Sequence, residues 1–485
     1  EGEKMRLFKI KILIVGEILI TLAFADWTCT YVGESHYPGS STLCIFVGDG
    51  DNDGYKEVYT GTWTPSPYYG YTHQFKWNGN IWIMDTLSTR HQYNIMDVTV
   101  GDANNDGENE VYSSAFAFLQ GETKDLYQFI FQDSIWILRD SLGREGGFQT
   151  FIADGDNDGL KEIYAIGHVY YTRVHQYKWN GSSWDLTMLG DNGYNFHSLY
   201  VGDGDNDNLN EIYATNVDGN IHYYKWEGDT WGEYLIPLNI PEEYCITFKG
   251  GLVIGDPDND GLNEVYCSFY RVSTPHYRLI YRYIWNGSNW IKDSIILIPD
   301  PDCINGGLVI GDGDNDGQDE IYDMNSPGTP GNIGIYKIFW NGINWQYEFI
   351  PATIAPGGPG IDLVLGDGDN DGLNELYLAT GTGRGKIYQF KYLQRIKEIR
   401  DFSYNEIKIY PVFTRGKVKF YISSPGKDRN LKIYDKLGRL VKILPVSGFT
   451  DFIIWDGKNV NNKIMNPDIY FVKLGSKTQK FLFLK

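Results

Sequence analysis

The sequence contains little cysteine, fewer basic than acidic residues and little helical pattern, and each shortage excludes some kinds of fold, site or partner. Its five cysteines show no close pair and no spacing typical of zinc sites, so we expect buried thiols, with one or two disulfides as the alternative. The 42 basic residues face 63 acidic ones, giving a formal net charge of −21. This balance argues against a nucleic-acid partner, because binding phosphates needs a basic surface.

Catalytic signatures are absent as well. The eight histidines are scattered, and no glycine-rich phosphate loop, zinc signature or Gly-x-Ser-x-Gly elbow occurs. We therefore expect a protein that is not an enzyme. A polysaccharide lyase or another extracellular enzyme built on the same fold stays open as an alternative.

Long hydrophobic runs occur only at the N-terminus. Four basic residues precede an apolar run from Ile12 to Leu22, and Ala23-Phe24-Ala25 follows as a small-x-small site. This order is typical of a secretory signal peptide, predicted here over residues 1–25. A membrane anchor is the alternative, but it would need about 20 apolar residues. Because no other stretch could cross a bilayer, we expect no membrane span in the mature chain.

Aromatic residues and glycine are abundant, with 37 Tyr, 24 Phe, 14 Trp and 56 Gly among 485 residues. This composition favours many short strands and tight turns. One pattern recurs seven times: an apolar strand, Gly-Asp-x-Asp-Asn-Asp-Gly or a close variant, two variable residues, and Glu-aliphatic-Tyr. Successive copies are 49 to 56 residues apart. Repeats of this period are typical of propellers and solenoids.

Each repeat predicts four strands. One strand precedes the acidic loop, one leaves it, and two flank a turn such as Trp77-Asn78-Gly79, a strong hairpin signal. The seventh repeat ends at Tyr392 without its fourth strand, whereas the segment after residue 25 offers an unpaired strand with Trp27 in the matching place. We predict an all-β fold over residues 26–392, a seven-bladed β-propeller whose last blade the N-terminal strand completes.

The acidic loops predict calcium sites. Carboxylates at positions 1, 3 and 5, a glycine at the sharp bend, the carbonyl of position 7 and a carboxylate at position 9 can surround one ion, as in an EF-hand loop. Hard oxygen ligands in a flexible cage favour Ca²⁺ over Mg²⁺, Zn²⁺ or copper. Ordinary solvated turns are the alternative, but seven such loops would crowd carboxylates together without a cation.

We expect up to seven structural Ca²⁺ ions as cofactors. The predicted ligands, loop by loop, are Asp49, Asp51, Asp53, Tyr55 and Glu57; Asp102, Asn104, Asp106, Glu108 and Glu110; Asp154, Asp156, Asp158, Leu160 and Glu162; Asp203, Asp205, Asp207, Leu209 and Glu211; Asp256, Asp258, Asp260, Leu262 and Glu264; Asp312, Asp314, Asp316, Gln318 and Glu320; and Asp367, Asp369, Asp371, Leu373 and Glu375. The second loop, with the neutral Asn104, is expected to bind more weakly. In the fourth loop Asn208 replaces the bend glycine, and asparagine tolerates a left-handed bend.

These loops resemble the FG-GAP/VCBS repeats of integrin α-subunit propellers and of many bacterial surface proteins. The resemblance covers Asp26 to Tyr392, although position 9 is Glu in all seven copies where that family usually has Asp. It implies a seven-bladed propeller used for binding or adhesion. It does not identify a ligand.

After a charged linker over residues 393–404, the repeat ends and residues 405–485 change character. This segment holds 16 basic and 6 acidic residues and several alternating apolar stretches, which predict a small β-sandwich of Ig-like type. Lys432-Ile433-Tyr434-Asp435, Trp455-Asp456-Gly457 and Ile469-Tyr470-Phe471-Val472 resemble the C-terminal sorting domain of type IX secretion cargo. The resemblance implies export by that machinery to the surface or surroundings of a Gram-negative bacterium. An ordinary accessory sandwich is the alternative.

The face opposite the acidic loops is the predicted ligand face. Its connections between strands two and three, and between successive repeats, are long and rich in aromatic residues, which suits recognition of sugars or proteins. The candidate residues are Trp63, Tyr69, Tyr71, Arg90, His91, Phe118, Arg144, Tyr171, His197 and Tyr270. We expect a monomeric binding or adhesion protein for an extracellular glycan or protein ligand, with a multivalent lectin as the alternative.

Overall fold

Strands are the only regular secondary structure in the part of the chain that the structure describes. The structure is a computed structural model. It describes residues 26–35, 39–64, 70–87, 94–116, 126–142, 147–167, 173–190, 196–241, 244–246, 249–271, 273, 275–299, 307–325, 333–352, 360–381, 385–393, 407–414, 417–422, 430–445, 452–474 and 477–483. The predicted signal peptide and residues 394–404 of the predicted linker lie outside these ranges.

Residues 26–393 form seven antiparallel sheets. In five of them the four strands follow one another in space as they do in the sequence, whereas the fifth sheet carries an extra short strand and the seventh takes its outer strand from the N-terminus. The first strands are β2 (Ser41–Gly48), β6 (Asn94–Gly101), β10 (Gly147–Ala153), β14 (Phe196–Gly202), β19 (Leu252–Gly255), β23 (Leu308–Gly311) and β27 (Gly360–Gly366). The second strands are β3 (Glu57–Trp63), β7 (Glu110–Phe116), β11 (Glu162–Gly167), β15 (Glu211–Asn216), β20 (Glu264–Arg271), β24 (Glu320–Asn325) and β28 (Glu375–Thr380).

The outer half of each sheet follows the same order. The third strands are β4 (Thr72–Trp77), β8 (Leu126–Gln132), β12 (Arg173–Trp179), β16 (Asn220–Trp226), β21 (Tyr277–Trp285), β25 (Gly334–Trp340) and β29 (Lys386–Leu393). The fourth strands are β5 (Trp82–Thr86), β9 (Ile135–Ser141), β13 (Trp184–Leu189), β17 (Trp231–Pro237), β22 (Trp290–Pro299), β26 (Trp345–Pro351) and β1 (Asp26–Glu34). A short extra strand, β18 (Tyr244–Ile246), also pairs with β20. This repetition of four-stranded antiparallel sheets is consistent with a β-propeller.

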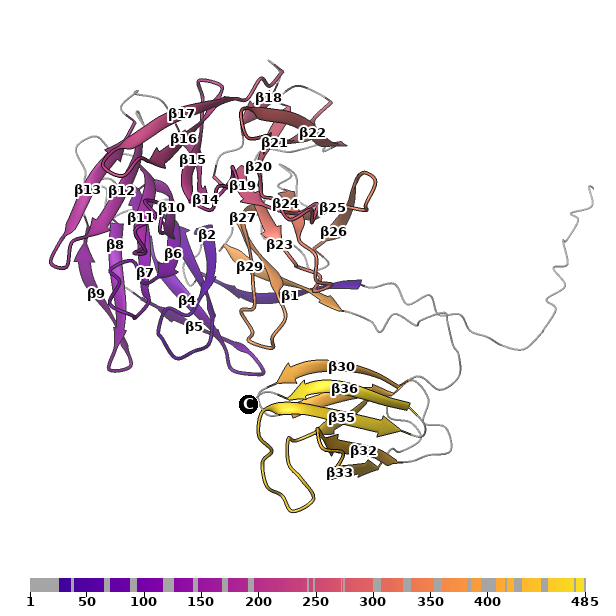
Figure 1. The fold of residues 1–485 in the computed structure, drawn as a ribbon. Coiled ribbons are helices and arrows are strands. Elements are labelled where there is room, and N and C mark those ends of the chain that lie inside the picture. The colour runs from indigo at the N-terminus through magenta and orange to yellow at the C-terminus, as the bar shows by residue number, and fades with distance from the viewer. Residues whose placement is uncertain are drawn as a thin grey trace, which may run out of the picture.

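The N-terminal strand completes the last sheet, as the sequence predicts. Strand β1 pairs antiparallel with β29, and Trp27 lies opposite Tyr392 in the register. Each first strand contacts the first strand of the next sheet, and β27 contacts β2, so these contacts close a ring. Figure 1 shows the sheets following one another around a common centre, with β1 beside β29.

A chain of asparagine side chains links each acidic loop to the next. At position 4 of the first loop, the side-chain oxygen of Asn52 accepts a hydrogen bond from the backbone N–H of Asn109 at 2.7 Å. The side-chain nitrogen of Asn52 donates to the backbone carbonyl of Asn109 at 2.9 Å. The same reciprocal pair recurs in the other loops. Asn370 of the seventh loop closes the circle on Lys56 of the first, at 2.8 Å for both bonds. All seven position 4 asparagines have a left-handed φ of 58° to 61°.

Replacing Asn370 by glycine is expected to lower the free energy of unfolding by about 1–2 kcal/mol, because two hydrogen bonds that join the first and last repeats are lost. Glycine keeps the left-handed backbone that Asn370 adopts, so the change isolates the side-chain bonds. Urea denaturation measures the effect. Asn208→Gly is the matched control, since Asn208 has a φ of 68° at a position where the other loops carry glycine. Equal stability of Asn370→Gly and wild type would contradict the role of the asparagine chain.

The repeated tryptophans pack between sheets. Trp82 of β5 lies edge-on against Tyr377 of the preceding sheet, with ring centroids 6.0 Å apart, and the other six fourth strands repeat this contact. Trp77 instead packs on Trp82 within its own sheet at 5.3 Å. In the turn between them only Gly79 has a positive φ, and Asn78 acts by accepting hydrogen bonds from the backbone N–H groups of residues 80 and 81. Gly79 therefore supplies the positive φ of this turn, and Asn78 supplies the side-chain oxygen that accepts hydrogen bonds.

The side chain of one lysine, Lys249, forms ion pairs with first strands near the centre of the ring. The Lys249 ammonium lies 2.7 Å from Asp97 Oδ1 on β6 and 2.9 Å from Asp362 Oδ2 on β27, and it also donates to the Met96 carbonyl. The Lys249 backbone N–H donates to the carbonyl of His197 on β14. Only 17% of the Lys249 side chain is exposed. This residue therefore ties together first strands from widely separated repeats.

The C-terminal segment forms two sheets that share one apolar core. The strands are β30 (Ile407–Thr414), β31 (Lys417–Ile422), β32 (Asn430–Asp435), β33 (Leu440–Pro445), β34 (Phe452–Trp455), β35 (Asp468–Leu474) and β36 (Lys477–Phe483). One sheet has the order β30-β31-β34 and the other β33-β32-β35-β36. Trp455 of the first sheet is fully buried against Tyr470 and Phe483 of the second.

Cys29, Cys44 and Cys267 are buried, as expected, and burial raises the pKa of the Cys44 and Cys267 thiols. Cys245 is exposed at the short strand β18, so the expectation of a buried thiol is wrong for this residue. Cys303 lies outside the described residues. Among the residues described, the structure contains no helix of the length and hydropathy needed to cross a membrane.

Candidate metal centres

Each acidic loop is curled around its first aspartate. In the first loop, the two Asp49 carboxylate oxygens accept the backbone N–H groups of Asp53 at 3.1 Å and Gly54 at 2.9 Å. All other loops repeat this pair of bonds. Asn208 adopts the left-handed φ expected of it in the fourth loop. The side chain of Tyr55 at position 7 is exposed, so this position can offer a metal only its main-chain carbonyl.

The curl brings the predicted carboxylates together. Ligand atoms lie within 4.8 Å of one another in groups such as Asp49, Asp51, Asp53 and Glu57. Equivalent groups form in other loops: Asp154, Asp156, Asp158 and Glu162; Asp203, Asp205 and Glu211; Asp256, Asp258 and Asp260; and Asp367, Asp369, Asp371 and Glu375. The structure therefore brings together the residues at positions 1, 3, 5 and 9 in the first, third and seventh loops, and three of these four positions in the fourth and fifth loops.

The tyrosine of the Glu-aliphatic-Tyr pattern orients the position 9 glutamate. Tyr59 donates its hydroxyl hydrogen to Glu57 Oε2 at 2.8 Å, and the other six repeats contain the same bond. The second oxygen, Oε1, is thereby turned toward the carboxylates of the loop. Burial raises the pKa of each of these seven glutamates to about 7. The sequence showed this tyrosine as part of the repeat but gave it no role.

In six of the loops, Oδ1 of the position 3 aspartate is buried without a hydrogen-bond partner among the described residues: Asp51, Asp156, Asp205, Asp258, Asp314 and Asp369. In four of these loops, Oε1 of the position 9 glutamate is also buried without a hydrogen bond. The Asp51 side chain is only 1% exposed. Buried polar atoms in native proteins almost always have a partner, and an ionised carboxylate is costly to bury unpaired. The pattern fits a cation that is bound at this oxygen.

The structure also shows a residue at these sites that sequence reasoning missed. A lysine or arginine of the third strand reaches the position 3 carboxylate in six repeats. Lys76 Nζ lies 2.5 Å from Asp51 Oδ2 and 2.9 Å from Asp53 Oδ2. The corresponding residues are Lys178, Lys225, Arg282, Lys337 and Lys391. The basic residues recur within three positions before the Trp-Asn-Gly turn, or before Tyr392 in the last repeat, and this spacing was the signal that could have revealed them.

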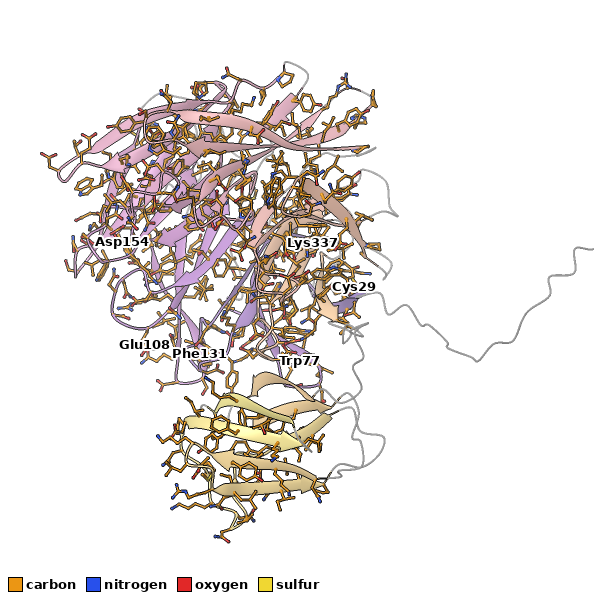
Figure 2. All side chains as sticks on the ribbon, turned by 45° about the vertical axis from the view of Figure 1, so that its right-hand side comes forward. Cys29, Trp77, Glu108, Phe131, Asp154 and Lys337 are labelled. Atoms are coloured by element: carbon orange, nitrogen blue, oxygen red, sulfur yellow. The ribbon has the colours of Figure 1, made fainter. Side chains whose placement is uncertain are left out.

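These residues fit Ca²⁺. All available donors are oxygens: one from each of the carboxylates at positions 1, 3, 5 and 9, with the carbonyl of position 7. Hard oxygen donors select calcium-like ions over Zn²⁺ or copper. One ammonium or guanidinium against four carboxylates leaves each of the six sites with a net charge of −3, so a further cation is still favoured. Figure 2 labels Asp154 and Lys337, which belong to two of these sites, and shows side chains filling the space between the sheets.

The predicted ligand-face residues are only partly described. Tyr71 is buried and its ring stacks on His73 at 6.1 Å, while Trp63 and Tyr270 are half-buried at the ends of β3 and β20. His197 is half-buried, and burial lowers its pKa. The remaining candidates lie outside the described residues: Tyr69, Arg90, His91, Phe118, Arg144 and Tyr171.

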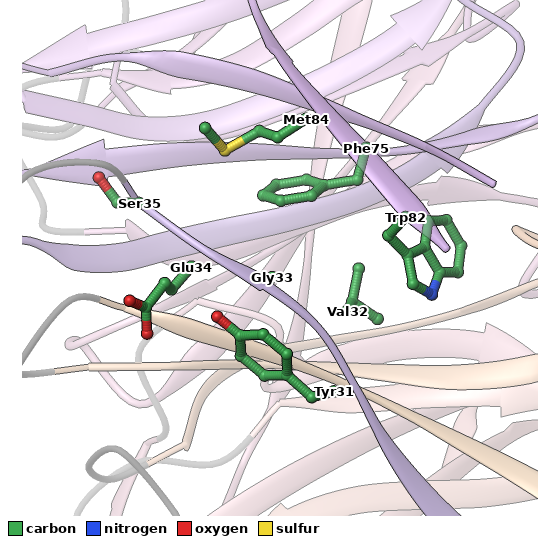
Figure 3. A pocket seen from close by; sticks show the side chains of 8 residues that line it. All are labelled: Tyr31, Val32, Gly33, Glu34, Ser35, Phe75, Trp82 and Met84. Atoms are coloured by element: carbon green, nitrogen blue, oxygen red, sulfur yellow. The ribbon is translucent and has the colours of Figure 1, made fainter. Parts of the chain in front are cut away.

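A pocket of about 510 Å³ lies where the last sheet meets the first. Its lining combines aromatic and apolar side chains with polar ones: Tyr31, Val32, Gly33, Glu34, Ser35, Phe75, Trp82 and Met84. In Figure 3, Phe75 and Met84 lie on one side of the segment that carries Gly33, and Tyr31 and Glu34 lie on the other. None of these residues was among the predicted ligand-face residues.

No protein-family model matches the chain, and no curated protein matches it. Among solved structures, it is similar to PorZ, a bacterial surface component of the type IX secretion system of Porphyromonas gingivalis, with 15% identity and a TM-score of 0.41 over 91% of this chain. The chain spans 60% of the length of PorZ. It is also similar to BBS1N solved with ARL6DN (12% identity, TM-score 0.45, 77% of this chain and 98% of that one). A third similar structure is a mutant of the Aleuria aurantia lectin in complex with α-methyl-L-fucoside (13% identity, TM-score 0.36, 67% of this chain and 99% of that one). At such low TM-scores these similarities carry no argument about this chain.

Proposed function

We propose that the chain is a secreted or cell-surface protein in which calcium stabilises a seven-bladed β-propeller of the FG-GAP/VCBS kind. The observation that carries the proposal is the buried, unpartnered Oδ1 of the position 3 aspartate, found in six loops of identical curl. Seven sheets whose first strands contact one another in a closed ring support the number of blades. The two sheets of the C-terminal segment, with their common core, support an Ig-like sandwich.

Calcium has a structural role in this proposal. The acidic loop connects the first and second strands of each sheet, and the asparagine chain joins it to the neighbouring loop. A bound ion, when present, supplies positive charge that compensates the loop carboxylates. The residues of the chain supply everything else, since Asp49 fixes the curl and Tyr59 orients Glu57. Metal binding and folding are therefore coupled.

We further propose that the propeller is a binding or adhesion module, and not an enzyme. Three of the eight histidines, His73, His175 and His222, occupy equivalent buried positions in third strands, which suits a structural use of these groups. The pocket lined by Phe75, Trp82 and Glu34 combines aromatic surface with polar groups, a composition that suits a sugar. The partner is an extracellular glycan or protein. The C-terminal segment serves as a sorting domain for type IX secretion in a Gram-negative bacterium.

A screen of the full chain against glycan and protein arrays, with calcium and with chelator, tests the binding function. Saturable binding that needs calcium would support it. Retention of several identical sugars per chain would select the multivalent lectin. No binding to any glycan or protein while the calcium-loaded protein stays folded would contradict the binding role.

Replacing Asp156 by alanine is expected to reduce the number of bound calcium ions by one, because the carboxylate that carries the unpartnered oxygen of the third loop is removed. Native mass spectrometry counts the ions. Hydrogen exchange should rise in β10 and β11, which the loop connects, and stay unchanged in distant sheets. Asp185→Ala on the exposed side of β13 is the control and should keep the full number of ions. An unchanged count in Asp156→Ala would contradict the assigned ligand.

A further inference from the structure

Each acidic loop with a position 3 aspartate is accompanied by one basic side chain from the third strand of its own sheet. Lys225 Nζ lies 2.6 Å from Asp205 Oδ2, 2.8 Å from Asp207 Oδ2 and 3.1 Å from Glu211 Oε1. Lys391 makes the equivalent three contacts at 3.0, 2.5 and 2.9 Å. The ammonium therefore contacts the carboxylates at positions 3, 5 and 9 together.

The basic residue occupies one of two places on the third strand. In four repeats it directly precedes the last aromatic residue of the motif, as Lys76 precedes Trp77. In the fifth and sixth repeats it stands two residues earlier, as Arg282 and Lys337. Residues two apart on a strand point to the same face, so both places serve the same loop. When one place is basic the other is neutral: Gln74 accompanies Lys76, and Ile284 accompanies Arg282.

The second repeat differs at both ends of this interaction. Its position 3 residue is the neutral Asn104, and both places on β8 are neutral, Gln128 and Ile130. The Asn104 side-chain amide donates to Glu110 Oε1, the position 9 oxygen that the lysine contacts elsewhere. Arg139 of the fourth strand approaches only the position 5 carboxylate of this loop, at 3.8 Å and from an exposed position. The second loop thus lacks both the position 3 carboxylate and the third-strand basic residue. Its three remaining carboxylates give a charge of −3, the same as four carboxylates and one basic residue give in each of the other loops.

Resting on the proposed calcium function, we propose that the third-strand basic residue is a built-in counterion that sets the net charge of each loop and thereby its affinity for calcium. In the first loop the ammonium uses Oδ2 of Asp51 and leaves Oδ1 of the same carboxylate unpartnered. The lysine and a bound ion therefore use different oxygens and are compatible with each other. Because the second loop has the same charge, it binds calcium about as strongly as the others, which replaces the expectation of weaker binding drawn from Asn104 alone.

The counterion role predicts in which direction the calcium affinity changes when the basic residue is removed. Removing the positive charge of Lys76 makes the first loop more negative and strengthens its attraction for Ca²⁺, since a unit charge a few ångströms away contributes on the order of 1 kcal/mol or more. Without calcium the same change leaves the buried carboxylates less compensated. The variant therefore binds calcium more tightly and melts at a lower temperature in chelator.

Native mass spectrometry of the full chain across a calcium titration tests the proposal. In Lys76→Met, one ion is expected to bind at a free calcium concentration about tenfold lower than in wild type. The double variant Asp51→Asn/Lys76→Met copies the charge of the second repeat and is expected to return to wild-type affinity. Conversely, Ile130→Lys places a positive charge beside the second loop and should weaken one site about tenfold.

The outcomes separate this inference from the proposed function. Absence of calcium from the wild-type protein would overturn the calcium function itself. Calcium binding to wild type with unchanged or weaker affinity in Lys76→Met would overturn only the counterion role. If Lys76→Met fails to fold, Ile130→Lys and the charge-balanced double variant decide: equal affinities in wild type and Ile130→Lys would overturn the proposal.

Discussion

Removing calcium from the folded protein is expected to lower its melting temperature by more than about 10 °C. An ion at a hundred times its Kd stabilises the native state by about 2.7 kcal/mol per site, and up to seven sites act together. For a large domain, each 1 kcal/mol shifts the melting temperature by roughly 2–4 °C. The third-strand basic residues offset part of the carboxylate repulsion, so we expect a destabilised but folded protein in chelator. Scanning calorimetry with and without chelator measures the shift.

Magnesium provides the control for this experiment. Calcium added back in excess should restore the original melting temperature, whereas Mg²⁺ at the same concentration should not, because Mg²⁺ keeps its waters and demands a stricter geometry. Identical melting curves in chelator and in calcium would contradict a structural role for the ion.

Replacing Lys249 by methionine is expected to lower the free energy of unfolding by about 3–5 kcal/mol, because it leaves Asp97 and Asp362 near the centre of the ring without their basic partner. Asp97 also accepts hydrogen bonds from Thr150, so the loss reaches a third sheet. Burial raises the pKa of Asp362, and the lysine opposes that shift. Urea denaturation measures the change.

Two further variants test whether the loss of stability in Lys249→Met comes from the central ion pairs. Lys161→Met, at an exposed position, should change stability by less than about 0.5 kcal/mol. Adding Asp97→Asn and Asp362→Asn to Lys249→Met should recover part of the loss, because no unpaired charge remains near the centre. A Lys249→Met protein as stable as the Lys161→Met control would show that the central ion pairs contribute nothing to the ring.

Much of the local structure could be predicted because the same sequence pattern recurs in all seven repeats. One acidic loop could be an ordinary turn, but seven in register locate the strands and place Trp27 opposite the end of the last repeat. The curl around Asp49 and the left-handed Asn208 follow from local residue preferences and are confirmed. Local chemistry and repetition therefore carried these predictions.

The long-range contacts could not be predicted in this way. Lys249 contacts Asp97 and Asp362, which belong to repeats far from it in the sequence, and no local pattern indicates that pairing. The reciprocal bonds of Asn52 depend on how neighbouring sheets sit against each other. The basic partner Lys76 was hidden because it lies on a different strand from the loop it serves, at a spacing that shifts by two residues among the repeats.

Elemental analysis of the purified, folded chain after dialysis into metal-free buffer shows whether the acidic loops hold calcium. We expect calcium as the bound metal, at up to seven ions per chain and well above one. A folded protein without bound calcium would contradict this expectation.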